Sequence, residues 1–242
     1  MLDLILVEFK KMRRRKAVVL LLLSAATMPL ISFIYFAGHR KILNDDMIVY
    51  KQAIFSFGFW VILPVCLGIL AAMLSYNETH GDILKQIWII PVSKVGYFFS
   101  KWVVLLVFSL VFMLLSGVFT LLPGIAFHFV QFRWESAILI LRQEVEAGIL
   151  AAIAILPILA LAVSQKGYLL TSCAAILYAF FGFILSSVNP YLLPSASMIF
   201  CVSQNLPNVA FPRAYNPLSI FLCFAIWSVA SLFYAYYSLR EK

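Results

Sequence analysis

Charged side chains are scarce in this sequence. Asp, Glu, Lys and Arg make up 12% of the 242 residues and hydrophobic residues 64%, whereas soluble domains carry about 25% charged residues. Several apolar runs approach the roughly 20 residues that a helix needs to cross a bilayer core. This composition excludes a soluble domain and predicts an all-α polytopic membrane protein.

Charge is missing altogether from the six apolar runs that we expect to span the membrane. These runs are residues 17–37, 53–75, 102–122, 147–164, 168–187 and 218–239. Ionisable groups inside membrane helices mark proton relays and ion paths. Their absence argues against a proton-coupled carrier, and we expect residues 1–242 to form a single transmembrane permease domain.

The sequence also lacks recognisable catalytic and nucleotide-binding patterns. There is no G-x-x-x-x-G-K-[ST] phosphate loop, so any ATP would be bound by another chain. The four cysteines have no metal-like spacing and the three histidines are far apart. Glu144 and Glu146 are paired carboxylates without a nearby histidine, and we interpret them as the solvated start of the fourth span. We therefore predict no catalytic residue, metal site or cofactor in this chain, and no enzymatic activity.

Basic residues are concentrated before the first apolar run. The net charge is +8, and a third of the Lys and Arg residues are Lys10, Lys11, Arg13, Arg14, Arg15 and Lys16. Such a cluster holds the start of a first span on the cytoplasmic side and contacts anionic lipid headgroups. No solvated basic face with base-reading groups accompanies it, so nucleic acid is not an expected partner.

Residues 1–16 have apolar side chains at helical spacing, including Ile5, Phe9 and Met12. This pattern is typical of an amphipathic helix lying in the membrane interface, where the basic residues anchor it. A solvated, frayed terminus is the alternative.

The distribution of Lys and Arg predicts the topology. Six spans place both termini on one side, which carries the six anchor residues together with Lys85, Lys94, Lys101, Lys166, Arg240 and Lys242. The other side carries Arg40, Lys41, Lys51, Arg133, Arg142 and Arg213. The excess predicts that both termini and the loop 76–101 are cytoplasmic. The Pro-rich segment 188–217 would then be extracellular, with one or two short helices.

The loop 76–101 is a long polar passage between the second and third expected spans. Glu78, Asp82 and Lys85 are at helical spacing, Pro91 interrupts the helix, and Lys101 marks the return to the bilayer. A short helix of this kind would fit a groove on a soluble partner, or would be an ordinary interfacial connector. Composition leaves both interpretations open.

The residues of this loop resemble a known signature. Glu78, Gly81, Pro91-Val92-Ser93 and Lys101 follow the E…G…P-x-S…K pattern of type-2 ATP-binding-cassette exporter permeases. The order of an interfacial helix, six spans, a long loop after the second span and a Pro-rich segment before the sixth is also similar. The length near 240 residues resembles lantibiotic (bacteriocin) immunity permeases, with bacitracin-resistance permeases as relatives. Asp82 departs from the pattern, because Thr often occupies that position.

The resemblance implies a permease subunit of an exporter that removes a membrane-active peptide, giving immunity or antibiotic resistance, in the bacterial cytoplasmic membrane. The implied partners are a dimer of a separate ATPase that binds ATP and Mg, a second copy or a homologous permease chain, lipids and the peptide. The residues implied to couple with the ATPase are Glu78, Thr79, His80, Gly81, Asp82 and Lys85. Those implied to shape the loop and its membrane re-entry are Pro91, Ser93, Lys94 and Lys101.

Two further expectations concern the second span. Pro64 and Gly68 would be flex points when the ATPase moves the span. Its aromatic residues would line a substrate route or simply pack, and they are Phe55, Phe57, Phe59 and Trp60. An ATP-independent channel or carrier for a small apolar solute, and a membrane-embedded enzyme, remain alternative functions.

Overall fold

The computed structural model describes residues 2–13, 15–38, 51, 54–80, 93–126, 134–165, 167–204, 206, 211 and 213–240. Regular secondary structure in this part of the chain is entirely helical, which confirms the predicted all-α class. The bounds of the elements after the N-terminal region are η3 Gly58–Ile62 (a π-helix), α5 Leu63–His80, α7 Lys94–Ala126, α8 Trp134–Ala154, α9 Leu156–Ser164, α10 Tyr168–Val188, α11 Pro194–Ser203 and α12 Pro217–Arg240.

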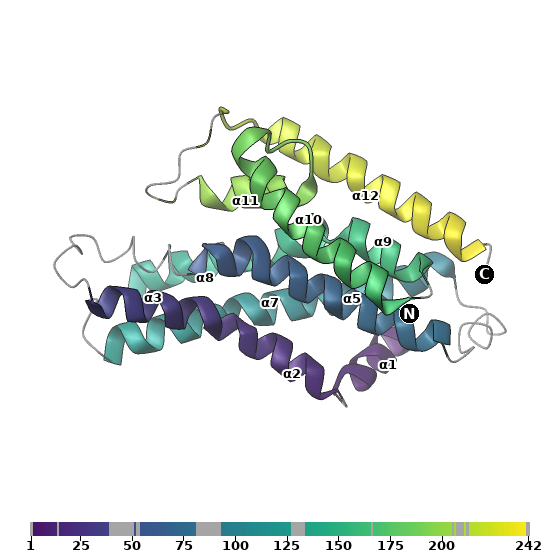
Figure 1. Ribbon diagram of the computed structural model, residues 1–242, viewed down its shortest axis with the longest axis horizontal. Helices are drawn as coiled ribbons and strands as arrows, with labels where there is room; N and C mark the ends of the chain where they lie inside the picture. The colour runs from purple at the N-terminus through teal and green to yellow at the C-terminus, as the bar shows by residue number, and fades with distance from the viewer. Residues whose placement is uncertain are drawn as a thin grey trace.

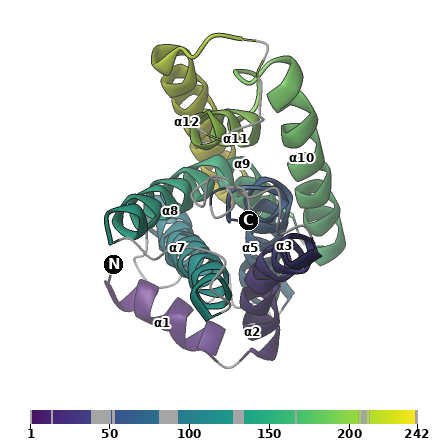
Figure 2. The ribbon, with the colours of Figure 1, turned by 90° about the vertical axis from the view of Figure 1, so that its left-hand side faces the viewer.

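The N-terminal region is a bent helical unit. It contains α1 (Leu2–Arg13), α2 (Lys16–Leu23), a 3₁₀ turn and α3 (Thr27–Gly38). The axis bends by 79° between α1 and α2, and α1 lies crosswise below the bundle in Figure 2. This is the arrangement expected of a helix that follows a membrane surface before the chain enters the bilayer.

Five helical segments in the described residues are long and apolar enough to cross a membrane, and the bent N-terminal unit makes a sixth. Two of them begin earlier than hydropathy indicated. One runs over Lys94–Leu122 and another over Ala137–Ser164, so Lys101 and Glu144 lie inside helices that meet the criteria for a span. The helices that carry the third and fourth expected spans therefore extend over ionisable residues that lie outside the bounds drawn from hydropathy.

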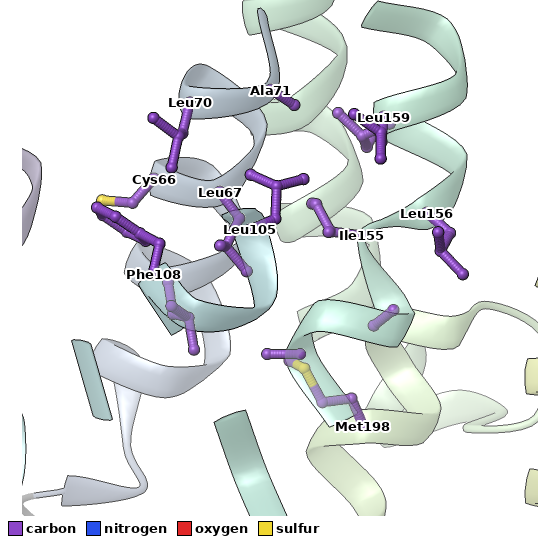
Figure 3. Close-up of a cluster of buried hydrophobic side chains, with 14 of the residues drawn as sticks. Cys66, Leu67, Leu70, Ala71, Leu105, Phe108, Ile155, Leu156, Leu159 and Met198 are labelled. Atoms are coloured by element: carbon purple, nitrogen blue, oxygen red, sulfur yellow. The ribbon is translucent and has the colours of Figure 1, made fainter. Parts of the chain in front are cut away.

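The buried core lies around α5, in the middle of the bundle. Figure 3 shows side chains from α5, α7, α9 and α11 meeting there. Those labelled are Cys66, Leu67, Leu70, Ala71, Leu105, Phe108, Ile155, Leu156, Leu159 and Met198. Small residues bring α5 close to α10, as is common between membrane helices, because a Cβ at Gly68 would collide with the side chain of Ala175. Gly68 is thus a close-packing position, which does not suit the role of flex point that we expected.

The start of α5 departs from regular helix geometry. The π-helix Gly58–Ile62 leads directly into it. Pro64 has no amide hydrogen to donate to the carbonyl of Trp60, and a wider turn accommodates this loss. The helix is therefore irregular directly before Pro64, which we expected to be a flex point.

The segment 188–217 contains one described short helix, α11, which packs against α10. The Tyr178 hydroxyl donates to the carbonyl of Ala154 at 2.6 Å and accepts the amide of Ser195 at 3.2 Å. Ala154 is the last residue of α8, where terminal carbonyls lack partners within the helix. One half-buried tyrosine therefore joins α8, α10 and α11.

The chain ends and the start of the predicted coupling loop gather at one end of the molecule. In Figure 1, α1, the end of α5, the start of α7 and the end of α12 lie at the right-hand side. The Lys94 ammonium donates to the carbonyl of Leu239 at 2.8 Å, and the rings of Tyr76 and Tyr168 are 6.2 Å apart. An even number of membrane spans requires the first and last helices to have their outer ends on the same side of the bundle, as they do here.

Candidate functional site

The predicted coupling residues begin at the end of α5. Glu78, Thr79 and His80 form its last residues, so the helix of the second span continues into them without a break. Gly81, Asp82 and Lys85 lie outside the described residues, as does Pro91. Because a continuous α-helix is stiff, a force applied near Glu78 would reach the span directly.

Ser93 and Lys94 hold the start of α7. The Gly96 amide donates to the Ser93 hydroxyl at 3.1 Å, which is a helix cap. The Lys94 ammonium at the Leu239 carbonyl satisfies a group in the last turn of α12, where a cation also complements the helix dipole. The first turn of α7 is thus attached to the end of α12.

Lys101 lies two turns further along α7 and is completely buried, with 0% of its surface exposed. Its ammonium is 3.3 Å from a Glu8 carboxylate oxygen, 3.1 Å from the Leu74 carbonyl, and 4.7 Å from the centre of the Tyr97 ring. We expected this lysine to mark the return to the membrane surface. The structure shows that it also joins α1, α5 and α7 inside the protein.

The sequence analysis did not identify Glu8 as a site residue. Its side chain is buried, with 4% of the residue exposed, and its carboxylate is also 3.5 Å from the Lys11 ammonium. A signal was present, because Ile5, Glu8, Phe9 and Met12 follow the i, i+3, i+4, i+7 spacing of one helix face. An acid on the apolar face of a surface helix requires a buried cation.

The buried Lys101 ammonium has two oxygen acceptors inside the protein. The lysine has three N–H donors, and Glu8 and Leu74 each accept from it. In an α-helix the Leu74 carbonyl is also the acceptor for the amide of Glu78. The ammonium therefore touches the helical turn that carries the first predicted coupling residue.

The predicted membrane anchors differ in their exposure, and Lys11 contacts Glu8 of this pair. Lys10 and Lys16 are exposed, whereas Lys11 and Arg15 are half-buried. Arg13 is the last residue of α1, and Arg14 lies outside the described residues. The exposed lysines remain available to lipid headgroups.

Glu144 contradicts the interpretation that it is solvated. It is 2% exposed, and its carboxylate fills the space that a side chain at Gly117 of α7 would need. Its Oε1 has no hydrogen-bond partner among the described residues. Glu146 does behave as expected, since it is exposed and pairs with Arg142 at 2.9 Å.

The aromatic residues before α5 divide into two groups. Phe55 and Phe59 are buried packing residues. Phe57 and Trp60 form a cluster with Phe183 of α10, with ring centres 5.3 to 5.7 Å apart. Trp60 also donates to the Ser203 hydroxyl at 2.9 Å, so its indole is held in place.

No set of three or more His, Cys, Asp or Glu residues suited to a metal ion occurs in the part of the chain that the structure describes. The polar groups at this end of the molecule can instead position helices relative to one another. That capacity is mechanical, because the ion pair, the carbonyl contact and the helix cap each join different elements.

The comparisons with known proteins identify the family of the chain. No curated protein sequence matches the chain. The family model described as "ABC-2 family transporter protein" matches residues 4–182, which include Glu8, Leu74, Lys101 and Glu144. This is well over half of the 242 residues. Members of that family are integral membrane permeases that work with an ATP-binding-cassette ATPase, and this chain belongs to the ABC-2 transporter family as a permease subunit.

Proposed function

We propose that this permease belongs to an exporter that removes a membrane-active peptide, a lantibiotic (bacteriocin) or related antibiotic, from the bacterial cytoplasmic membrane. The observation that supports coupling to an ATPase is the continuous helix α5, whose last residues Glu78–His80 begin the predicted coupling segment; the peptide substrate comes from the resemblance. The Lys101 contact to Leu74 attaches the same turn to α7 and α1. An ATPase that pulled on this segment would therefore move three elements together.

The coupling segment would bind a cleft of the ATPase through Glu78, Thr79, His80, Gly81, Asp82 and Lys85. Pro91 and Ser93 would return the chain to α7, with Lys94 and Lys101 holding the helix in register. The ATPase dimer would bind ATP and Mg, and its closure would favour one permease conformation. Such driving requires that the ATPase bind the two conformations with different affinity.

The assembly would contain a second copy of this chain or a homologous permease, with both termini in the cytoplasm. A peptide taken from the bilayer would contact apolar surfaces before leaving on the other side. The cluster of Phe57, Trp60 and Phe183 lies on the α5–α10 side of the bundle and offers one such surface. Phe57 is 47% exposed, which supports its availability.

The first test is purification of the tagged chain from its native membrane in mild detergent, with identification of the co-purifying chains. A soluble ATPase together with another six-span chain would support the heteromeric exporter. An ATPase alone would favour two copies of this permease. If no ATPase is recovered even after cross-linking, the exporter proposal fails, and transport by the chain alone in liposomes would test the channel or carrier.

The same purification applied to Glu78→Gln and Asp82→Asn tests the coupling segment. We expect both variants to insert in the membrane but to lose most of the ATPase. Glu146→Gln is the matched control, because it removes an exposed carboxylate from α8 and leaves the predicted segment intact. Normal ATPase recovery with both test variants would contradict the assignment of these residues.

A further inference from the structure

We propose that Glu8 and Lys101 are positioning residues that make the surface helix α1 a moving part of the transporter. By this inference α1 follows the coupling end of α5 through the buried ion pair and is more than a membrane anchor. The inference rests on the proposed function, because it requires an ATPase that acts on that end.

The first argument is that the pair connects elements that are otherwise remote in sequence. Lys101 and Glu8 are 93 residues apart in sequence, and Lys101 and Leu74 are 27 apart. The ammonium touches both at once, since it lies between α1 and α5 on the inner face of α7. If the last turns of α5 move relative to α7, either the contact between Lys101 and the Leu74 carbonyl changes, or the ammonium follows Leu74 and its contact to Glu8 changes.

The second argument is the way the lysine is held. Tyr97 lies one turn before it on α7, and its ring is 4.7 Å from the ammonium. Residues four apart share a helix face, so the ring lies beside the lysine and supports its ammonium. A supported side chain of this kind has little freedom to absorb a movement of α5 by itself. The displacement is therefore passed on to Glu8 and α1.

The third argument is that anchoring alone does not require these residues. Lys10 and Lys16 are exposed and can contact lipid headgroups without a buried partner. A buried ion pair is seldom more stable than apolar residues of similar volume, although losing one partner is strongly destabilising. The two charged side chains thus connect α1, α5 and α7 through directional polar contacts, which we call the joint. An apolar contact would not fix the direction in this way.

The test uses the intact permease–ATPase complex in liposomes. Cysteines at Lys10 on α1 and Val95 on α7, both exposed positions, carry spin labels, and Cys173, the exposed native cysteine, is replaced by serine. The distance between the labels is measured without nucleotide and after trapping with ATP and vanadate. We expect the distance to change between the two states in the otherwise native complex.

In the double variant Glu8→Leu/Lys101→Met, we expect the complex to be recovered but the nucleotide-dependent distance change to be lost. Lys101→Arg, which keeps the charge, should retain the change. If the double variant does not insert, Glu8→Gln alone should reduce the change, because it removes the charge of the partner while the glutamine side-chain oxygen can still accept from the Lys101 ammonium. If the pair served only in packing, the nucleotide-dependent distance change would be the same in Glu8→Leu/Lys101→Met and in Lys101→Arg.

Two results would overturn the inference. One is a distance change in Glu8→Leu/Lys101→Met, or in Glu8→Gln should that be needed, equal to the native one. The other is a native complex in which the ATPase is trapped with nucleotide but α1 does not move. Failure of the proposed function is distinguishable, since the native chain would then recover no ATPase at all, and the inference would fall with it.

Discussion

Two buried ionisable side chains contribute to the surroundings of α7, one from α7 itself and one from α8. The protein accommodates them in different ways. Lys101 belongs to α7 and has a carboxylate, a carbonyl and an aromatic ring around its ammonium. Glu144 reaches α7 from α8 and lies against Gly117. The first position joins helices through polar contacts, whereas the second is made by removing a side chain from the neighbouring helix.

The two positions also lie at different points along the axis of α7. Lys101 and Gly117 are separated by 16 residues (117 − 101), which corresponds to about 24 Å along a helix. Lys101 is near the end where α1, the end of α5 and the end of α12 gather (Figure 1). Glu144 is in the seam between α7 and α8, where the Ser109 hydroxyl donates to the Gly148 carbonyl. Burial of a charge therefore does not by itself indicate a common role.

The largest expected effect is that of Lys101→Met, which leaves the buried Glu8 carboxylate with only the partly exposed Lys11 ammonium at 3.5 Å. We expect a loss of about 3–5 kcal/mol in the free energy of unfolding, because an uncompensated buried charge is costly. Denaturant titration in mixed micelles measures it. Glu8→Leu/Lys101→Met should recover most of the loss, and equal stability of the single variant and the native chain would show that the pair is not buried as described.

Gly117→Ala should have an intermediate effect. A new Cβ would overlap the Glu144 carboxylate, and overpacking of this kind costs about 1–3 kcal/mol. Circular dichroism during thermal unfolding of the purified permease would detect it as a lower midpoint. Shortening the opposing residue in Gly117→Ala/Glu144→Ala should reverse the loss, whereas an unrescued double variant would mean that Gly117 is needed for another reason.

The smallest effect is expected for the exposed pair on α8. Arg142→Ala or Glu146→Ala removes a 2.9 Å salt bridge, yet exposed pairs contribute only about 0–1 kcal/mol. The same thermal measurement, repeated at high salt, should show almost no difference from the native chain. A loss as large as that of Lys101→Met would remove the distinction between buried and exposed charge on which the comparison depends.

Several residues of the site could be named from the sequence, but their burial could not be predicted from it. Lys101 was identified through the resemblance and Ser93 with it, and both lie at the start of α7. Hydropathy placed the beginning of the third span after Lys101 because a lysine normally ends an apolar run. The helix begins earlier, since Ser93 caps it and Glu8 and Leu74 satisfy the ammonium. Glu144 was misread for the same reason.

The sequence by itself determined the helical class, the membrane location and the crosswise N-terminal helix, because hydrophobic length and charge placement are local properties of the chain. It also pointed to the family through the residues of the loop after the second span. Only the tertiary structure decided which charges are buried and what they touch. Such a decision needs atoms from α1, α5 and α7 to meet within hydrogen-bond distance, and no pattern within one helix specifies that meeting.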